Sequence, residues 1–160
     1  EHKGLYRQGF AASLEPDADF YLPFGVARMV EEGSDFTIIT WGAIVQKSIE
    51  ATKNSGISIE IIDLRTIKPL DWKTVFESVK RTGKLLVLDT GFTTGSVAGE
   101  IIAKTLIEKF NYITKAPMRL AMPDIPEPTS YALTKRLYIT SIDIITSVLK
   151  LLNTCQSLIL

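Results

Sequence analysis

The hydrophobic and polar positions of this chain predict an alternation of strands and helices that begins at Pro23. Two short apolar runs, 24–30 and 36–41, flank the turn signal EGSD at 32–35. Runs of this length, bounded by turn residues, are typical of strands. The two predicted strands would pair as a hairpin or lie at a sheet edge.

A helix is predicted over 43–54, and Gly56 follows where a C-terminal cap is common. Three side chains share its predicted buried face, namely Val45, Ile49 and Thr52. The run ISIEIID at 57–63 predicts the next strand. Asp71 then suits the N-cap of a second helix, which ends at Thr82-Gly83. Its apolar residues have i, i+3, i+4, i+7 spacing and are Trp72, Val75, Phe76 and Val79.

The second half continues the alternation. The apolar run 85–88 is typical of a strand covered on both faces, and the glycine-containing loop 91–99 leads into a helix over 97–110. A short strand is predicted over 117–121. The segment 122–128 contains three prolines, which lack backbone N–H donors and predict an irregular connection.

The last helix begins with Thr140 and Asp143 at the spacing of a capping box. An apolar stripe is predicted to face the core and consists of Ile142, Ile145, Leu149 and Leu152. The whole pattern predicts an α/β fold, a three-layer αβα sandwich with a largely parallel sheet. We divide the chain into an interdomain linker (1–22), one domain (23–152) and a C-terminal tail (153–160).

Composition narrows the classes of function. The 160 residues carry 18 Lys+Arg and 18 Asp+Glu, so no overall field attracts nucleic acid or an anionic membrane. Cys155 is the only cysteine, which excludes an internal disulfide and a four-ligand Cys/His zinc site. We therefore expect a reducing, cytoplasmic setting, and no apolar run is long enough to span a membrane. Because the first residue is Glu1 instead of Met, we expect these residues to be part of a longer polypeptide.

Few residues suggest a catalytic or ligand-binding role. His2 is the only histidine and lies in the predicted linker, where nothing would orient it for catalysis. Cys155 has no basic neighbour that would lower its pKa. The glycines at 91, 95 and 99 precede a helix, where free N–H groups can bind an anion, but they fit neither common nucleotide motif. Close helix-strand packing with tight turns is the better account of these glycines, and a phosphate or sulfate site at Gly95 and Ser96 is the alternative.

Three carboxylates follow predicted strands at the edge where α/β sheets usually bind ligands. They are Asp63, Asp89 and Asp124. A polar pocket on this edge is one interpretation. Because Asp is also common in turns and caps, we favour a structural role for all three.

Several short strings, in their order and separations, carry a resemblance. They are PFGVAR (23–28), EGSD (32–35), TWG (40–42), IDLRT (62–66), PLD (69–71), TGK (82–84), PDIP (123–126) and LYI (137–139). Together they resemble the C-terminal domain of transketolase-like enzymes, from Pro23 to about Leu152. The opening EHKGLYR is similar to the linker before this domain in beta subunits of 2-oxoacid dehydrogenase first components of the 2-oxoisovalerate, pyruvate or acetoin type.

The resemblance implies a five-stranded, mostly parallel sheet with one antiparallel edge strand. In such enzymes thiamine diphosphate and Mg are bound by other domains, through a Gly-Asp-Gly motif that does not occur in this sequence. The resemblance therefore implies no catalytic, cofactor or metal ligand in this chain. At 89–92 this sequence has DTGF, where many relatives have an acidic pair or His-Glu. This difference affects the assignment to a substrate subfamily more than the assignment of the fold.

The implied function is that of an assembly domain in a beta subunit whose holoenzyme decarboxylates a 2-oxoacid and acylates a lipoyl group. Expected partners are an alpha subunit or region, a second beta subunit and a dihydrolipoyl acyltransferase core. An apolar patch on the last helix or at 158–160 would suit docking, and the isolated chain is expected to be inactive. Two alternatives are the C-terminal domain of a transketolase or deoxyxylulose-phosphate synthase, and a stand-alone scaffold or anion-binding domain. Gly95, Ser96 and Asp124 are the candidate anion or partner site.

Overall fold

The computed structural model describes residue 9 and the ranges 12–53, 55–135 and 137–152. The predicted C-terminal tail, His2 and Cys155 lie outside these described residues. Of the predicted linker, residue 9 and residues 12–22 are described. The boundaries of linker, domain and tail stay predictions.

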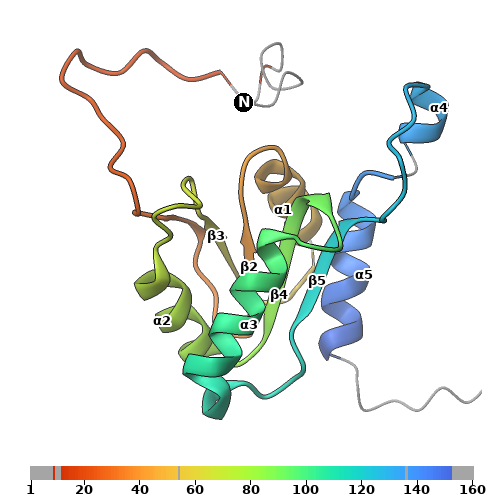
Figure 1. Cartoon of the computed structure of the whole chain (residues 1–160). Coiled ribbons are helices and arrows are strands. Elements are labelled where there is room, and N and C mark those ends of the chain that lie inside the picture. The colour runs from red at the N-terminus through yellow and green to blue at the C-terminus, as the bar shows by residue number, and fades with distance from the viewer. Residues whose placement is uncertain (1–8, 10–11, 54, 136, 153–160) are drawn as a thin grey trace, which may run out of the picture.

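Five strands form one sheet in the order β1-β3-β2-β4-β5 (Figure 1). They are β1 (Arg28–Glu31), β2 (Phe36–Thr40), β3 (Ile59–Asp63), β4 (Leu85–Phe92) and β5 (Met118–Met122). The edge strand β1 is antiparallel to β3, and the other neighbours are parallel. This confirms the mostly parallel sheet with an antiparallel edge. The hairpin alternative is wrong because β3, not β1, lies beside β2.

Helices cover both faces of the sheet, which confirms the αβα sandwich (Figure 1). The helices α1 (Ile44–Thr52) and α5 (Ser141–Leu152) pack on one face. The helices α2 (Trp72–Thr82) and α3 (Val97–Lys109) pack on the other. Two short elements were not predicted from the sequence, namely the 3-10 helix η3 (Phe110–Tyr112) and α4 (Tyr131–Thr134).

The strand β2 shows how the layers are built, because all five of its residues are buried. Phe36 and Ile38 pack in the cluster beneath α1 and α5, and Ile39 packs in the cluster beneath α2 and α3. Thr37 lies on the α2 side, where its hydroxyl is within 2.6 Å of those of Ser78 and Thr82. Side chains of a strand alternate between faces, so a central strand covered twice is apolar throughout.

Two predicted caps are confirmed. Asp71 accepts a hydrogen bond from the Thr74 N–H at 3.1 Å and caps α2. At the start of α5, the Asp143 carboxylate accepts from the Thr140 N–H at 2.9 Å and the Thr140 hydroxyl accepts from the Asp143 N–H at 3.3 Å. These side chains satisfy backbone donors that a helix end leaves without partners.

The predicted core face of α5 is wrong at Ile142 and Leu149. Ile142 is 73% exposed and Leu149 is 44% exposed, whereas the fully packed residues are Ile144, Val148 and Leu151. Both sets fit the helical period because α5 is apolar on more than one side, so spacing alone does not identify the core face. Ile145 and Leu152 are partly buried against the same cluster.

The buried face of α1 and the end of β4 also differ from the prediction. In α1 the buried residues are Ile44, Ser48 and Thr52, and the two hydroxyls donate to backbone carbonyls four residues earlier at 3.0 Å. The strand β4 extends through Phe92, which pairs with Met122 after an irregularity in the register. Residues 89–92 therefore lie in the strand and not after it.

Replacing Asp71 with Ala is expected to lower the free energy of unfolding by about 1–2 kcal/mol. The carboxylate also accepts from the Ala27 N–H at 3.0 Å and so joins α2 to the segment before β1. Burial acts to raise the pKa of Asp71, but the hydrogen bonds from Ala27 and Thr74 outweigh it, and the pKa lies below 3.8. A lowered folded pKa stabilises the protein above the unfolded pKa, and this contribution is lost as the pH falls through the folded pKa.

Urea denaturation of wild type and Asp71→Ala at pH 7 and below pH 4 measures this effect. The difference in unfolding free energy should shrink at the lower pH. The exposed Glu108 of α3 provides the control, because Glu108→Ala removes a carboxylate that caps nothing. An equal difference at both pH values would contradict the assignment.

Candidate functional site

The carboxyl ends of the parallel strands lie at one edge of the sheet. From β2 the chain passes through α1 to β3, and from β4 it passes through α3 to β5. Because β2 and β4 are neighbours, these two connections leave in opposite directions. Ligands of open α/β sheets bind in the crevice at such a topological switch point. The space between the ends of β2 and β4 is thus the first place to look for a site.

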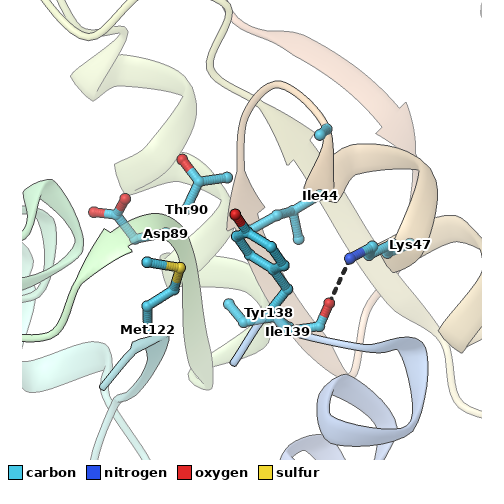
Figure 2. Close-up of a pocket in the computed structure, with 8 residues that line it drawn as sticks. Ile44, Lys47, Asp89, Thr90, Met122, Tyr138 and Ile139 are labelled. Carbon is cyan, nitrogen blue, oxygen red and sulfur yellow. Dashed lines mark hydrogen bonds between the residues drawn. The ribbon is translucent and has the colours of Figure 1, made fainter. Parts of the chain in front are cut away.

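A cavity of about 230 Å³ lies at this point (Figure 2). Its lining comes from the start of α1, the end of β4, the end of β5 and the segment before α5, with residues Ala43, Ile44, Lys47, Asp89, Thr90, Met122, Tyr138 and Ile139. Ile44, Met122 and Ile139 are buried. The walls are therefore largely apolar.

Lys47 and Tyr138 bring polar groups to the cavity. The Lys47 Nζ donates to the Ile139 carbonyl oxygen at 2.7 Å, which fastens the segment before α5 to α1 (Figure 2). The Tyr138 hydroxyl donates to the Glu127 carboxylate, and this hydrogen bond raises the pKa of Tyr138 above its ordinary value. Tyr138, which is 42% exposed, forms part of the cavity wall.

Asp89 is buried, with 5% of its surface exposed. One carboxylate oxygen accepts from the Gly91 N–H at 2.8 Å and the other from the Ala98 N–H at 3.2 Å. Both oxygens thus hold the connection between β4 and the first turn of α3. Figure 2 shows the carboxyl group pointing away from Lys47. The structure gives Asp89 a positioning role.

Gly95 and Ser96 lie together at the start of α3. Gly95 has φ +73°, and the Ser96 hydroxyl accepts from the Gly99 N–H at 3.2 Å as the N-cap. With Arg119 they line an open hollow of about 390 Å³. The anion site at this place stays a prediction, and the acidic Glu100 lies in the same helix turn.

Asp124 and Asp63 lie apart from that hollow. The Asp124 carboxylate accepts from the Thr94 N–H at 2.8 Å and from the Thr94 hydroxyl at 2.6 Å. These hydrogen bonds hold the pKa of Asp124 below its ordinary value. Asp124 lines a separate hollow beside Phe92. At the end of β3, the Asp63 carboxylate accepts from the Arg65 N–H at 3.1 Å. The three carboxylates do not form one pocket, and each contacts backbone N–H groups.

Sequence reasoning missed the cavity between β2 and β4. The segments that line it, 43–47, 89–90, 122 and 138–139, are far apart in the chain, and their meeting depends on the order of the strands. Gly42 was the local sequence signal for the tight turn between β2 and α1, where the cavity begins. In the structure this glycine has φ +62°.

Within the described ranges, no group of three or more His, Cys, Asp or Glu side chains could hold a metal ion. The same part of the chain contains no helix long and apolar enough to cross a membrane.

Comparisons with known proteins place these features in a family context. The family model "Transketolase, C-terminal domain" matches residues 25–144. The chain is 39% identical over 132 residues to the pyruvate dehydrogenase E1 component subunit beta of Acholeplasma laidlawii, covering 80% of this chain and 39% of that protein. It is 38% identical over 144 residues to the beta subunit of acetoin:2,6-dichlorophenolindophenol oxidoreductase of Cupriavidus necator, covering 88% of this chain and 41% of that protein.

A solved structure described as "Split gene transketolase, inactive beta4 tetramer" is similar with a TM-score of 0.71 and 26% identity, covering 88% of this chain and 46% of that chain. This chain therefore spans less than half the length of these relatives.

Proposed function

Since this chain belongs to the transketolase C-terminal domain family, we propose that it forms the C-terminal domain of the beta subunit of a 2-oxoacid dehydrogenase first component. The observation that carries the proposal is the similarity, over most of this chain, to beta subunits of pyruvate dehydrogenase and of an acetoin oxidoreductase. The holoenzyme would oxidatively decarboxylate a 2-oxoacid and acylate a lipoyl group. The similarity to both pyruvate and acetoin enzymes supports the class of 2-oxoacid dehydrogenase first components but does not identify the substrate.

Thiamine diphosphate and Mg belong to the proposal as cofactors of the holoenzyme, bound by other domains. Thiamine diphosphate supplies carbanion stabilisation for decarboxylation. The described residues do not fit this cofactor, because they offer no metal-binding cluster and because Asp89 and Asp124 are hydrogen-bonded within the chain. No step of the reaction is therefore assigned to them, and the isolated chain is expected to be inactive.

The role of this domain would be assembly with an alpha subunit or region, a second beta subunit and an acyltransferase core. Large apolar side chains are exposed before β1, including Tyr21 at 78% and Phe24 at 81%. On α5, Ile142 is exposed at 73%. Contiguous exposed apolar side chains mark interfaces with other domains or subunits, and Phe20, Tyr21, Leu22 and Phe24 follow one another closely in the segment before β1. These residues support an assembly role, and the solved relative is itself described as a tetramer.

The location proposed for the protein is the cytoplasm, on the basis of its single cysteine. Relatives named mitochondrial occur in Arabidopsis thaliana and Pisum sativum. The second candidate function, the C-terminal domain of a transketolase, is supported by the similarity to the split gene transketolase at 26% identity.

An assay of the complete protein with its alpha subunit or region separates the two candidates. With thiamine diphosphate and Mg present, we expect reduction of 2,6-dichlorophenolindophenol with pyruvate, acetoin or 2-oxoisovalerate. This dye accepts the electrons directly, so no acyltransferase core is needed. Transfer of a ketol group between sugar phosphates, without dye reduction by any of the three compounds, would contradict the proposal and favour a transketolase.

A further inference from the structure

We propose that the outward face of α3 is the surface through which this chain pairs with a second copy of itself, with the two α3 helices antiparallel about a two-fold axis. Such a contact would provide a surface for the second beta subunit of the proposed function, but it depends only on the residues of α3. Self-association of the chain can therefore fail while the dye assay succeeds, and the reverse.

The two helices on this face of the sheet have different outer sides (Figure 1). The exposed residues of α2 are all charged and are Lys73, Glu77, Lys80 and Arg81. On α3 the exposed Ala103 is followed by Ile107 at 81% exposure, and Phe110, directly after the helix, is 69% exposed. Their i, i+4, i+7 spacing makes one apolar stripe along the outer side of α3. An exposed apolar stripe of this kind marks an interaction surface.

The stripe is complementary to itself in size. A two-fold axis brings the same surface of both copies together, so the surface must fit itself. With the axis at the level of Leu106, positions equally far before and after Leu106 lie opposite one another in the antiparallel pair. Ile107 then packs beside Ile107 of the second copy, and Phe110 lies beside that copy's Ala103. The largest side chain of the stripe thus meets the smallest, which lets the two helices approach closely.

The charges beside the stripe select this register. Lys104 and Glu108 are one turn apart on the same flank of α3, two residues before and two residues after Leu106. Because the axis brings like flanks together, Lys104 of each copy faces Glu108 of the other. Centring the pair two residues earlier or later would instead place Lys104 against Lys104, or Glu108 against Glu108. Opposite charges therefore favour the same register as the apolar side chains.

Both charged groups are available for this contact. Neither Lys104 nor Glu108 forms an ion pair within the part of the chain that the structure describes. The Lys104 Nζ lies 4.3 Å from the ring centroid of Trp72, which holds the ammonium group on this flank while other N–H donors of the group can serve a carboxylate. Glu108 is exposed.

The contact is small, because α3 has 13 residues and presents only one side. One helix face buries less than the about 800 Å² per partner of a standard interface. We therefore expect a weak dimer, with a Kd of about 10–100 µM. Urea denaturation at about 1 µM chain follows the monomer, since the dimer is not populated there.

Sedimentation equilibrium of the 160-residue chain, from about 5 to 500 µM and at low salt, measures the pairing. The wild type should change from monomer to dimer across this range. Ile107→Asp should weaken the association at least tenfold, because two carboxylates would enter the apolar centre of the contact. Lys150→Glu reverses an exposed charge on α5, on the other side of the sheet, and should keep the wild-type Kd.

Mixing two charge variants tests the register itself. Lys104→Glu alone and Glu108→Lys alone should each weaken self-association at least tenfold, because like charges then face each other at both ends of the contact. An equimolar mixture of the two variants should recover a Kd near that of the wild type, because each charge again faces its opposite. Mixing changes no residue within a chain, so altered folding cannot produce the recovery.

Three results would overturn the proposal. The first is a wild-type chain that stays monomeric at about 500 µM. The second is wild-type affinity in Ile107→Asp or in either charge variant, which would place the contact elsewhere on the chain. The third is a mixture of the two charge variants that associates no better than each variant alone.

Discussion

Replacing Gly33 with Ala is expected to lower the free energy of unfolding by about 3 kcal/mol or more. A Cβ at this position would overlap the backbone of Ile59 and Glu60 at the start of β3. That backbone pairs with Phe36 and Thr37 of β2, and the next residue, Ile61, pairs with Glu31 of β1, so it has little freedom to move away. The cost comes from steric overlap, because Gly33 does not have a positive φ.

Chemical denaturation of Gly33→Ala and Gly56→Ala measures the effect against a matched control. Gly56 has φ +69°, and no atom lies within 4 Å of the place that an alanine Cβ would occupy, so Ala there costs only about 1 kcal/mol of backbone strain. Gly33→Ala should be clearly the less stable variant. Equal stability of the two would show that the chain at β3 is looser than described.

The second large effect is expected for Arg81→Met, at about 2–3 kcal/mol. Glu60 lies in β3 with only 2% of its side chain exposed, and the Arg81 Nη2 is 2.6 Å from both of its carboxylate oxygens. Removing the arginine leaves a buried carboxylate without its cation. The side chain of Arg81 is 51% exposed, so we place the loss below that of a fully buried pair.

A double variant and a surface control complete this test. Adding Glu60→Gln to Arg81→Met should restore part of the lost stability, because the buried charge is then gone. Lys80→Met removes the exposed pair of Lys80 with Glu77 and should cause no measurable change. A double variant less stable than Arg81→Met would show that the ion pair does not explain the effect.

Much of the fold follows from local signals. The cap at Asp71 and the capping box of Thr140 and Asp143 mark helix starts in the sequence, and both form the expected hydrogen bonds. Apolar runs located the strands because a sheet covered on both faces buries nearly every residue. Strand pairing and the core-facing side of a helix were harder to predict. Pairing of β1 depends on the strand order, and the core face of α5 is not specified by an apolar pattern that continues around the helix.

The candidate site illustrates the same limit. The hydrogen bonds of Asp89 and Asp124 agree with the structural role favoured from sequence. The cavity needs Lys47 from α1 and Ile139 from a segment about ninety residues later, joined by one hydrogen bond. Nothing in their spacing indicates this contact, because it exists only once β2 and β4 are neighbours.

The proposal of an assembly domain is tested most directly by exchanging domains. Residues 12–152 of this chain replace the matching C-terminal region of the Acholeplasma laidlawii pyruvate dehydrogenase E1 beta subunit, and association with that enzyme's alpha subunit is measured by size-exclusion chromatography with light scattering. A beta subunit truncated before this region is the control. We predict that the chimera associates with the alpha subunit and that the truncated subunit does not. A folded chimera that stays separate from the alpha subunit would contradict the account.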